Sequence, residues 1–162
     1  MSRRYAATLT LALLILCSLN AFAQAPPKAY GPPIGVENAK KIAAVALAEA
    51  KKNNWYMAVA VVDPSGTLVY YEKMDNTQTG SATVAISKAH SAALFKRPTK
   101  VFEDAVAGGG AGLRVLAVPG AIPLEGGIPL IMDDKIVGAV GVSGDSSDHD
   151  GICAKAAAEA LK

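Results

Sequence analysis

The sequence predicts an α+β fold, in which one antiparallel sheet is flanked by helices. Two pairs of short apolar segments, each joined by a tight polar turn, predict two β-hairpins. Helical patterns stand before the first hairpin, between the two hairpins and after the second. Because the strands of a hairpin pair antiparallel, we expect one layered domain with the order α-β-β-α-α-β-β-α.

Residues 1–23 carry the pattern of a secretory signal peptide. Two arginines precede an apolar run, and Ala21-Phe22-Ala23 forms a small-x-small cleavage site. The apolar run is shorter than the roughly 20 residues of a membrane anchor. Cys17 raises the alternative of lipoprotein processing. Leu16 before it disfavours this alternative, because it is bulky where a small residue is required. We therefore expect an exported protein, periplasmic or extracellular, with no membrane span after cleavage.

Cleavage would leave a chain of about neutral charge. The full sequence has 16 basic and 14 acidic side chains, and two of the basic ones are the arginines of the signal peptide. A surface without excess positive charge argues against nucleic-acid binding. Cys153 would be the remaining cysteine, so no intramolecular disulfide is expected. The remaining length fits one domain.

The first half of the domain follows a proline-rich leader over residues 24–34, which we expect to be extended. Residues 36–53 show a helical period, with alanines on one face and lysines mostly on the other. Residues 55–62 are apolar and strand-like. The turn Asp63-Pro64-Ser65-Gly66 then leads into a second strand over 67–74, which completes the first hairpin.

A central helix is predicted from Gly80 to the residue before Pro98, because proline disfavours helical geometry in its predecessor. Its inner positions are mostly alanine, and such a small-residue surface lets another backbone come close. The same helix carries Lys88, His90 and a basic exit formed by Lys96 and Arg97.

The second half begins with a short helix, which Pro98 can open and which runs to about Val106. Residues 108–112 form a flexible glycine segment, and residues 113–123 are ambiguous. Residues 126–132 and 135–142 predict the second hairpin, in which glycines at 138 and 141 indicate close packing of a helix or ligand. A closing helix covers 147–161, and Ser147-x-x-Asp150 resembles a capping box.

Two stretches resemble ligand-binding loops but lack residues that those loops require. The glycine cluster at 108–112 lacks the Gly-Lys-Ser/Thr ending of a phosphate-binding loop. The acidic stretch at 145–151 is not a calcium loop, because Ala157 stands where a bidentate glutamate is required. Neither motif therefore supports nucleotide or calcium binding.

Two histidines remain as ligand candidates. His90 could bind a metal or a haem iron, against the alternative of a structural or exposed side chain. His149 and Cys153, four residues apart on the closing helix, could hold a metal, against the alternative of a solvated helix start. No Ser-His-Asp order or paired-carboxylate signature can be placed, so the catalytic residues stay unknown and enzymatic activity stays open.

Four stretches resemble the GlcG/HbpS-like family of haem-binding or haem-degrading proteins. Their order and spacing cover about residues 36–160. They are Ala58-Val59-Ala60-Val61-Val62-Asp63-x-x-Gly66, then Ser81-Ala82 with Lys88-Ala89-x-Ser91-Ala92 and Phe95-x-Arg97-Pro98-Thr99, then Gly126-Gly127-Ile128-Pro129-Leu130, and finally Ile136-Val137-Gly138-Ala139-Val140-Gly141-Val142-Ser143-Gly144 followed by Asp148.

The resemblance implies a profilin- or PAS-like domain in residues 35–162, assembly into homo-oligomers, and binding of haem or a related tetrapyrrole. We therefore expect an exported, homo-oligomeric haem-binding protein that acts in haem or iron handling or in redox sensing. One alternative is an enzyme that degrades haem or acts on a small organic acid such as glycolate. Another is a non-catalytic oligomeric signalling module with an extracytoplasmic sensor partner.

The expected haem pocket lies between the central helix, the Pro98-Thr99 step and the glycine loop. Tetrapyrroles require a mostly apolar cleft with few polar anchors. His90, which the family does not fix at this position, and Thr99 are the candidates for the iron. Lys88, Lys96 and Arg97 are expected to pair with the propionates.

Overall fold

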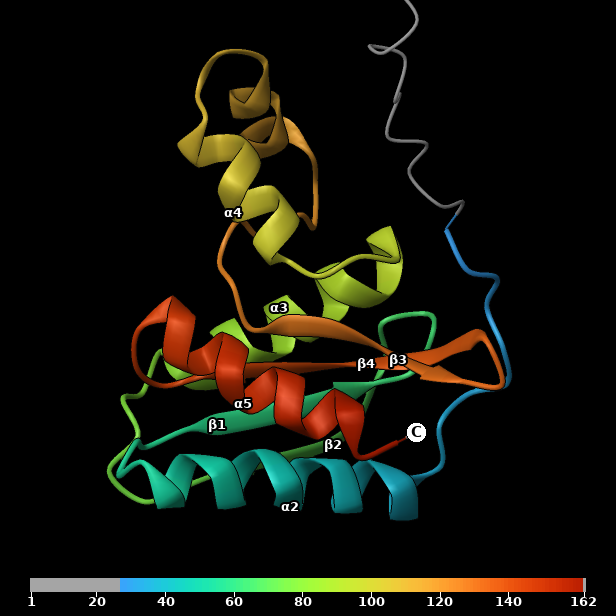
Figure 1. Ribbon diagram of the computed structural model, residues 1–162, viewed down its shortest axis with the longest axis vertical. Helices are drawn as coiled ribbons and strands as arrows, with labels where there is room; N and C mark the ends of the chain where they lie inside the picture. Colours follow the sequence, from blue (N-terminus) through green and yellow to red (C-terminus); the bar gives the residue numbers. More distant parts are fainter. Residues whose placement is uncertain (1–26, 162) are drawn as a thin grey trace, which may run out of the picture.

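The computed structural model describes residues 27–161 and shows the predicted α+β class (Figure 1). Its elements, in chain order, are α2 (Val36–Lys52), β1 (Ala58–Val62), β2 (Leu68–Lys73), α3 (Ser81–Phe95), α4 (Lys100–Ala107), the 3₁₀ helix η1 (Gly110–Ala117), β3 (Gly127–Met132), β4 (Lys135–Ser143) and α5 (Ser147–Glu159). The predicted order is confirmed, with η1 as an addition.

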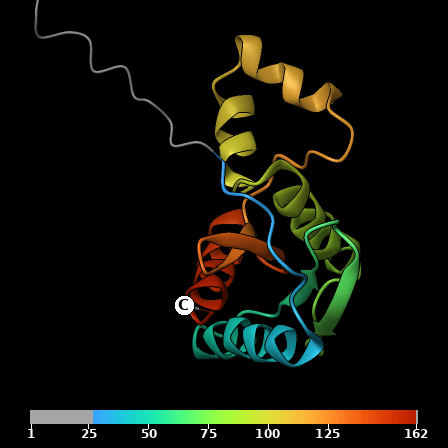
Figure 2. The same ribbon diagram turned by 90° about the vertical axis from the view of Figure 1, so that its right-hand side faces the viewer.

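The four strands form one antiparallel sheet in the order β2-β1-β4-β3. The first hairpin, β1–β2, and the second, β3–β4, join through the pairing of β1 with β4. Helix α3 covers one face of the sheet, while α2 and α5 cover the other (Figure 2). All five residues of β1 are buried, because this central strand is covered on both faces.

The alanine-rich helix α3 packs closely on the sheet, as its composition predicts. A Cβ added at Gly141 of β4 would overlap the backbone of α3 at Ala85 and Ala89. A Cβ at Gly138 would overlap the Val62 carbonyl of the neighbouring strand. The prediction that a helix or ligand packs closely on these two strand glycines is therefore confirmed at Gly141, where the packed element is α3. At Gly138 it is wrong, because the close neighbours are the adjacent strand and Ile34.

Helices α4 and η1 stand away from the sheet layers (Figures 1 and 2). The flexible segment expected over 108–112 instead leads into η1, whose Gly112 lies directly against the Ala105 carbonyl of α4. Glycine at this position lets the two helices touch. Leu113 and Leu116 on η1 remain exposed, at 50% and 64% of their surface.

The N-terminal cap of α5 differs from the prediction. The cap residue is Ser146, whose hydroxyl accepts the His149 N–H at 3.4 Å, rather than Ser147. Asp150 does not act in a capping box. Its carboxylate is drawn inward to Lys88 and accepts the Asp145 N–H at 3.3 Å.

The described part of the leader, residues 27–34, packs on the domain and is here called the strap. Tyr30 forms a parallel bridge with Ile136 at the start of β4, and Ile34 is buried in the core. Among the described residues, no helix is long and apolar enough to cross a membrane. The predicted signal peptide, residues 1–23, lies outside the described residues.

Candidate functional site

Two of the predicted site residues, Lys88 and His90, lie on the central helix α3, but their side chains point in different directions. Residues two positions apart on an α-helix are separated by about 200° around its axis. Lys88 and His90 therefore point to nearly opposite sides. Lys88 faces α5 and the start of β3, whereas His90 faces the turn between β1 and β2. The structure thus does not gather these two residues in one pocket.

Lys88 is committed to a buried ion pair. Its ammonium donates to the Asp150 carboxylate at 2.6 Å, and the two side chains are 2% and 3% exposed. Burial raises the pKa of Asp150, while the Lys88 charge opposes that rise. The pair joins α3 to α5 in the interior, so the ammonium contacts protein rather than solvent.

Thr99 is also enclosed by protein. Its hydroxyl accepts the Gly127 N–H at 2.9 Å, its own N–H donates to the Gly127 carbonyl at 2.9 Å, and the residue is fully buried. A Cβ added at Gly127 would come within 2.7 Å of the Thr99 methyl and would overlap the Lys88 carbonyl. The structure therefore brings Thr99 and Lys88 together around Gly127, at the start of β3, where they hold the strand to α3.

His90 lies half-buried against the β1–β2 turn. Its Nδ1 is 3.2 Å from the Gly66 carbonyl oxygen. A carbonyl oxygen only accepts, so Nδ1 carries a proton, and in the neutral tautomer of the ring Nε2 then carries the lone pair. No described residue bonds Nε2, and among the described residues the only buried side-chain polar atom without a partner is Ser81 Oγ. Nε2 is therefore not fully enclosed by the protein.

Two glycines border the His90 ring, and exposed apolar residues lie on the same helix and loop. Gly66 has φ +84°, and a Cβ there would overlap Nδ1, so the turn can approach the ring only at glycine. A Cβ added at Gly120, in the loop after η1, would lie 3.9 Å from Cδ2 and Nε2 of His90, so this loop borders the ring edge that carries Nε2. Leu94, one helical turn further along α3, is 40% exposed, as is Val118 in the same loop as Gly120. The imidazole thus stands in a partly apolar surface with one unpaired nitrogen.

The basic exit of α3 meets the strap. The Tyr30 hydroxyl donates to the carbonyls of Ala93 and Leu94 at 2.9 and 3.2 Å, so it satisfies last-turn carbonyls of the helix. The Lys96 ammonium lies 4.0 Å from the centre of the Tyr30 ring. Arg97 is exposed and donates through Nε to the Phe95 carbonyl at 3.0 Å, which leaves its outer guanidinium nitrogens at the surface.

A hollow of about 320 Å³, here called the strap groove, lies where the strap, the end of α3 and the edge strand β3 meet. Two of its lining side chains are Lys28 and Lys96. The others are apolar: Pro27, Pro98, Ile128, Pro129, Ile131 and Ile136. The sequence predicted Lys96 and Pro98 near a pocket. It did not predict Lys28 or β3 there, because the strap, the end of α3 and β3 are far from one another in the chain.

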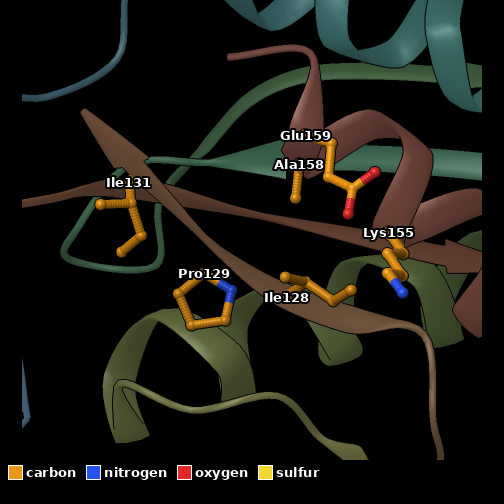
Figure 3. Close-up of a pocket in the computed structure, with 6 residues that line it drawn as sticks. All are labelled: Ile128, Pro129, Ile131, Lys155, Ala158 and Glu159. Atoms are coloured by element: carbon orange, nitrogen blue, oxygen red, sulfur yellow. The ribbon is translucent and has the colours of Figure 1, made fainter. Parts of the chain in front are cut away.

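A second hollow of about 220 Å³ lies between the same edge strand and α5 (Figure 3). Ile128, Pro129 and Ile131 line it from β3, and Lys155 and Glu159 reach it from α5. This hollow carries both charge signs, so it is less selective for an anion than the strap groove.

His149 and Cys153 do not share a site. The His149 ring stacks on Trp55 with centroids 3.9 Å apart, and its Nδ1 is 3.1 Å from the Asp145 carboxylate. Cys153 is fully buried, and burial raises the pKa of its thiol to about 12. A protonated, enclosed thiol is a poor metal ligand. The structure therefore explains His149 as a packing residue at the start of α5.

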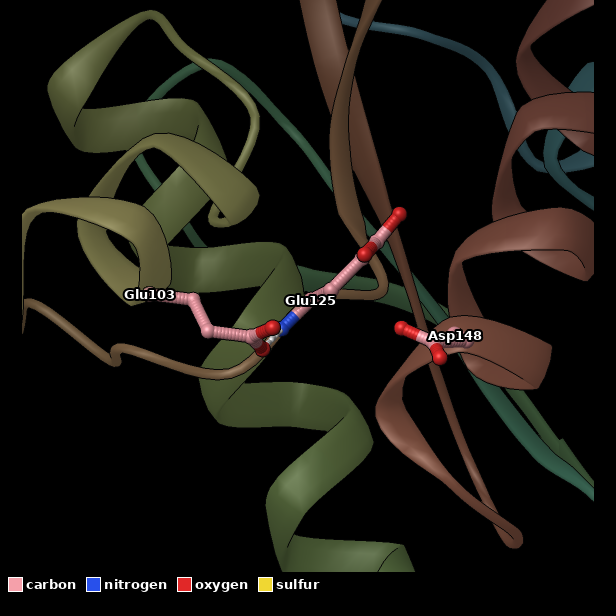
Figure 4. A group of neighbouring side chains, drawn as sticks. All are labelled: Glu103, Glu125 and Asp148. Atoms are coloured by element: carbon pink, nitrogen blue, oxygen red, sulfur yellow. Dashed lines mark hydrogen bonds between the residues drawn. The ribbon is translucent and has the colours of Figure 1, made fainter. Parts of the chain in front are cut away.

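One acidic group escaped sequence reasoning. Carboxylates of Glu103, Glu125 and Asp148 come from α4, the loop before β3 and α5, and their oxygens lie within 4.8 Å of one another (Figure 4). Glu103 accepts the Glu125 N–H at 2.6 Å, and burial raises the pKa of Glu125. Lys100 pairs with Glu103 at 3.9 Å and offsets part of the charge. No local sequence signal joins residues so far apart, and we assign the group no ligand.

The donor chemistry at His90 fits a haem iron. A neutral imidazole ligates through the nitrogen that carries no proton, and a hydrogen bond from the other nitrogen sets the tautomer and ring orientation. His90 has both features, with Gly66 as acceptor. Thr99 does not offer its hydroxyl in the same way, because that oxygen is buried against Gly127.

Comparison with known proteins places most of the chain in one family model. The model for haem degrading protein HbpS-like matches residues 34–159. Protein GlcG of Escherichia coli is 41% identical over 105 residues, which cover 65% of this chain and 77% of GlcG.

Two solved structures have the same fold. The structure of HbpS matches with a TM-score of 0.74 at 29% identity, covering 82% of this chain and 92% of HbpS. The structure of a complex of PduOC with haem matches with a TM-score of 0.72 at 25% identity, covering 80% of this chain and 96% of PduOC.

Proposed function

Because the chain belongs to the HbpS-like family of haem degrading proteins, we propose that it binds haem and that His90 ligates the iron. The observation that carries the site is the orientation of His90, whose Nδ1 is bonded to Gly66 while Nε2 has no partner among the described residues and is not fully enclosed. The family description and the haem complex of PduOC, which shares this fold, support haem as the ligand.

The residues around His90 have separate roles in this proposal. Gly66 holds the ring and keeps the proton on Nδ1. Leu94 and Val118, both partly exposed, offer apolar contacts to the ring of the ligand. Arg97 offers outer guanidinium nitrogens to a propionate. Bound haem would supply a redox-active iron.

Lys88 and Thr99 act behind the site in this proposal. Both are buried, and their polar atoms bond Asp150 and Gly127. They fix the position of α3 against β3 and α5, and so they hold the helix that presents His90. We expect their substitution to change stability before it changes any contact with haem.

Export and self-association belong to the same proposal. Export is supported by the signal-peptide pattern of residues 1–23. Self-association is supported by the exposed leucines of η1, which an isolated domain leaves in water. An exported haem protein of this kind would serve haem or iron handling or redox sensing, the latter with a sensor partner.

A haem titration followed by absorbance near the Soret band tests the site. The variants are His90→Ala and, as a matched control for the second histidine, His149→Ala. We expect saturable binding by the wild type and by His149→Ala. In His90→Ala we expect a shifted Soret maximum and weaker binding, both restored by free imidazole, which can enter the space left by the side chain. An unchanged spectrum and affinity in a folded His90→Ala variant would remove His90 from the iron.

A further inference from the structure

The strap groove has the features of a second ligand site, and nothing in the haem proposal uses it. It lies beyond the C-terminal end of α3, and His90 is not among the residues that line it. We propose that the strap groove binds a small carboxylic acid with an apolar body, independently of His90. The carboxylate would lie between Lys28 and Lys96, and the body over Ile128 and Ile131 of β3.

The wall of the groove formed by the strap is firmly attached. Gly31 donates to the Ile136 carbonyl and Ile136 donates to the Ala29 carbonyl, at 2.8 and 2.9 Å. Ile34 donates to the Val137 carbonyl at 2.8 Å, and the Tyr30 hydroxyl bonds the last turn of α3. The strap is therefore tied to both β4 and α3, and the groove exists before a ligand arrives.

The lining of the groove is rigid as well as apolar. Three of its side chains are prolines, namely Pro27 of the strap, Pro98 after α3 and Pro129 of β3. Proline has a fixed φ and little side-chain freedom to lose, so ordering the lining on binding costs little entropy. A preformed apolar surface of this kind favours an apolar ligand.

The charge of the lining selects an anion. Among the described residues that line the groove, two are lysines and none is acidic. Lys28 pairs with Asp134, but both side chains are exposed, at 43% and 84%, so this ion pair is weak and exchangeable. Lys96 lies over the Tyr30 ring, which positions its ammonium without neutralising it.

The edge strand argues against a peptide as the occupant. A chain that adds to a sheet edge needs a row of backbone donors and acceptors, and Pro129 removes one donor from β3. The lining residues include no imidazole, thiol or thioether, so the site recognises a carboxylate and an apolar body rather than a metal. An aliphatic acid and the propionate edge of a tetrapyrrole share this chemistry.

Isothermal titration with two carboxylates tests the proposal and separates these sources. The probes are decanoate and metal-free protoporphyrin IX, with decanol as the uncharged match of decanoate. The variants are Lys96→Glu and Lys28→Glu, with Lys40→Glu on the distant α2 as the charge-reversal control. Binding of decanoate by His90→Ala shows whether the two sites are separate, since metal-free protoporphyrin has no iron for His90 to ligate.

We expect saturable binding of at least one carboxylate, weakened about tenfold or more by Lys96→Glu, as for the loss of one charge-assisted hydrogen bond. Lys40→Glu and His90→Ala should bind it like the wild type, and decanol should bind weakly and not respond to Lys96→Glu. If decanoate is the probe that Lys96→Glu weakens, the ligand is an aliphatic acid; if protoporphyrin is, the ligand is a tetrapyrrole.

The proposal is overturned if neither carboxylate binds, or if folded Lys96→Glu and Lys28→Glu bind it as tightly as the wild type. It is also overturned if His90→Ala abolishes the binding, because the groove would then not be separate. A Lys96→Glu variant that does not fold leaves Lys28→Glu as the deciding variant. None of these results alters the haem test at His90, so the two proposals can fail separately.

Discussion

The buried pair between Lys88 and Asp150 gives the sharpest stability prediction. Replacing Lys88 by Met keeps an unbranched side chain, one atom shorter, but leaves the Asp150 carboxylate without its partner at 2.6 Å. With both side chains at most 3% exposed, water cannot replace the ammonium. Removing one member of such a pair costs about 3–5 kcal/mol, a large share of the roughly 5–15 kcal/mol of a typical domain.

The loss of stability in Lys88→Met should depend on pH in a defined direction. Burial already raises the pKa of Asp150, and the Lys88 charge limits that rise. In Lys88→Met the pKa of Asp150 rises further, so the folded state keeps a proton that the unfolded state releases above its ordinary value of 3.8. Stability then falls as pH rises, by at most about 1.4 kcal/mol per pH unit. We expect the deficit against wild type to be smaller at pH 4 than at pH 7.

Urea unfolding of the wild type, Lys88→Met and Lys88→Met/Asp150→Asn at both pH values measures these effects. The double variant removes both charges, while Asn keeps the shape of Asp and Met keeps most of the lysine chain. We expect it to be more stable than the single variant at pH 7 by about 1 kcal/mol or more, because no charge is then left unpaired. A deficit below about 1 kcal/mol, or one that does not change with pH, would refute the role of the buried charge.

Two further predictions use residues around α5. The single tryptophan, Trp55, stacks on His149, so its fluorescence should change in His149→Ala and stay like the wild type in the control His90→Ala. Unchanged emission in a folded His149→Ala variant would contradict the stacked geometry. Cys153 is fully buried and its thiol pKa is raised to about 12, so a thiol reagent at pH 8 should modify it only after unfolding. Rapid labelling of the folded protein would contradict its burial.

Local patterns were enough to predict most of the fold. Both hairpins, the central helix and the closing helix follow from short-range signals, such as the Asp63–Gly66 turn and the stop before Pro98. The two misjudged features depend on packing. Ser146 rather than Ser147 caps α5, because Asp150 is drawn to Lys88. The glycine segment forms η1, because Gly112 lets it pack on α4.

The sequence by itself determined the fold class, the family resemblance and the placing of His90 on the central helix. Hydrophobic period and turn chemistry act over a few residues, so they can be read directly. Only the tertiary structure decided what each side chain faces. His90 meets Gly66 across 24 positions, and Lys88 meets Asp150 across 62. The strap groove likewise needs the leader, the end of α3 and β3 together. Such partners depend on how the chain returns on itself, which no local pattern specifies.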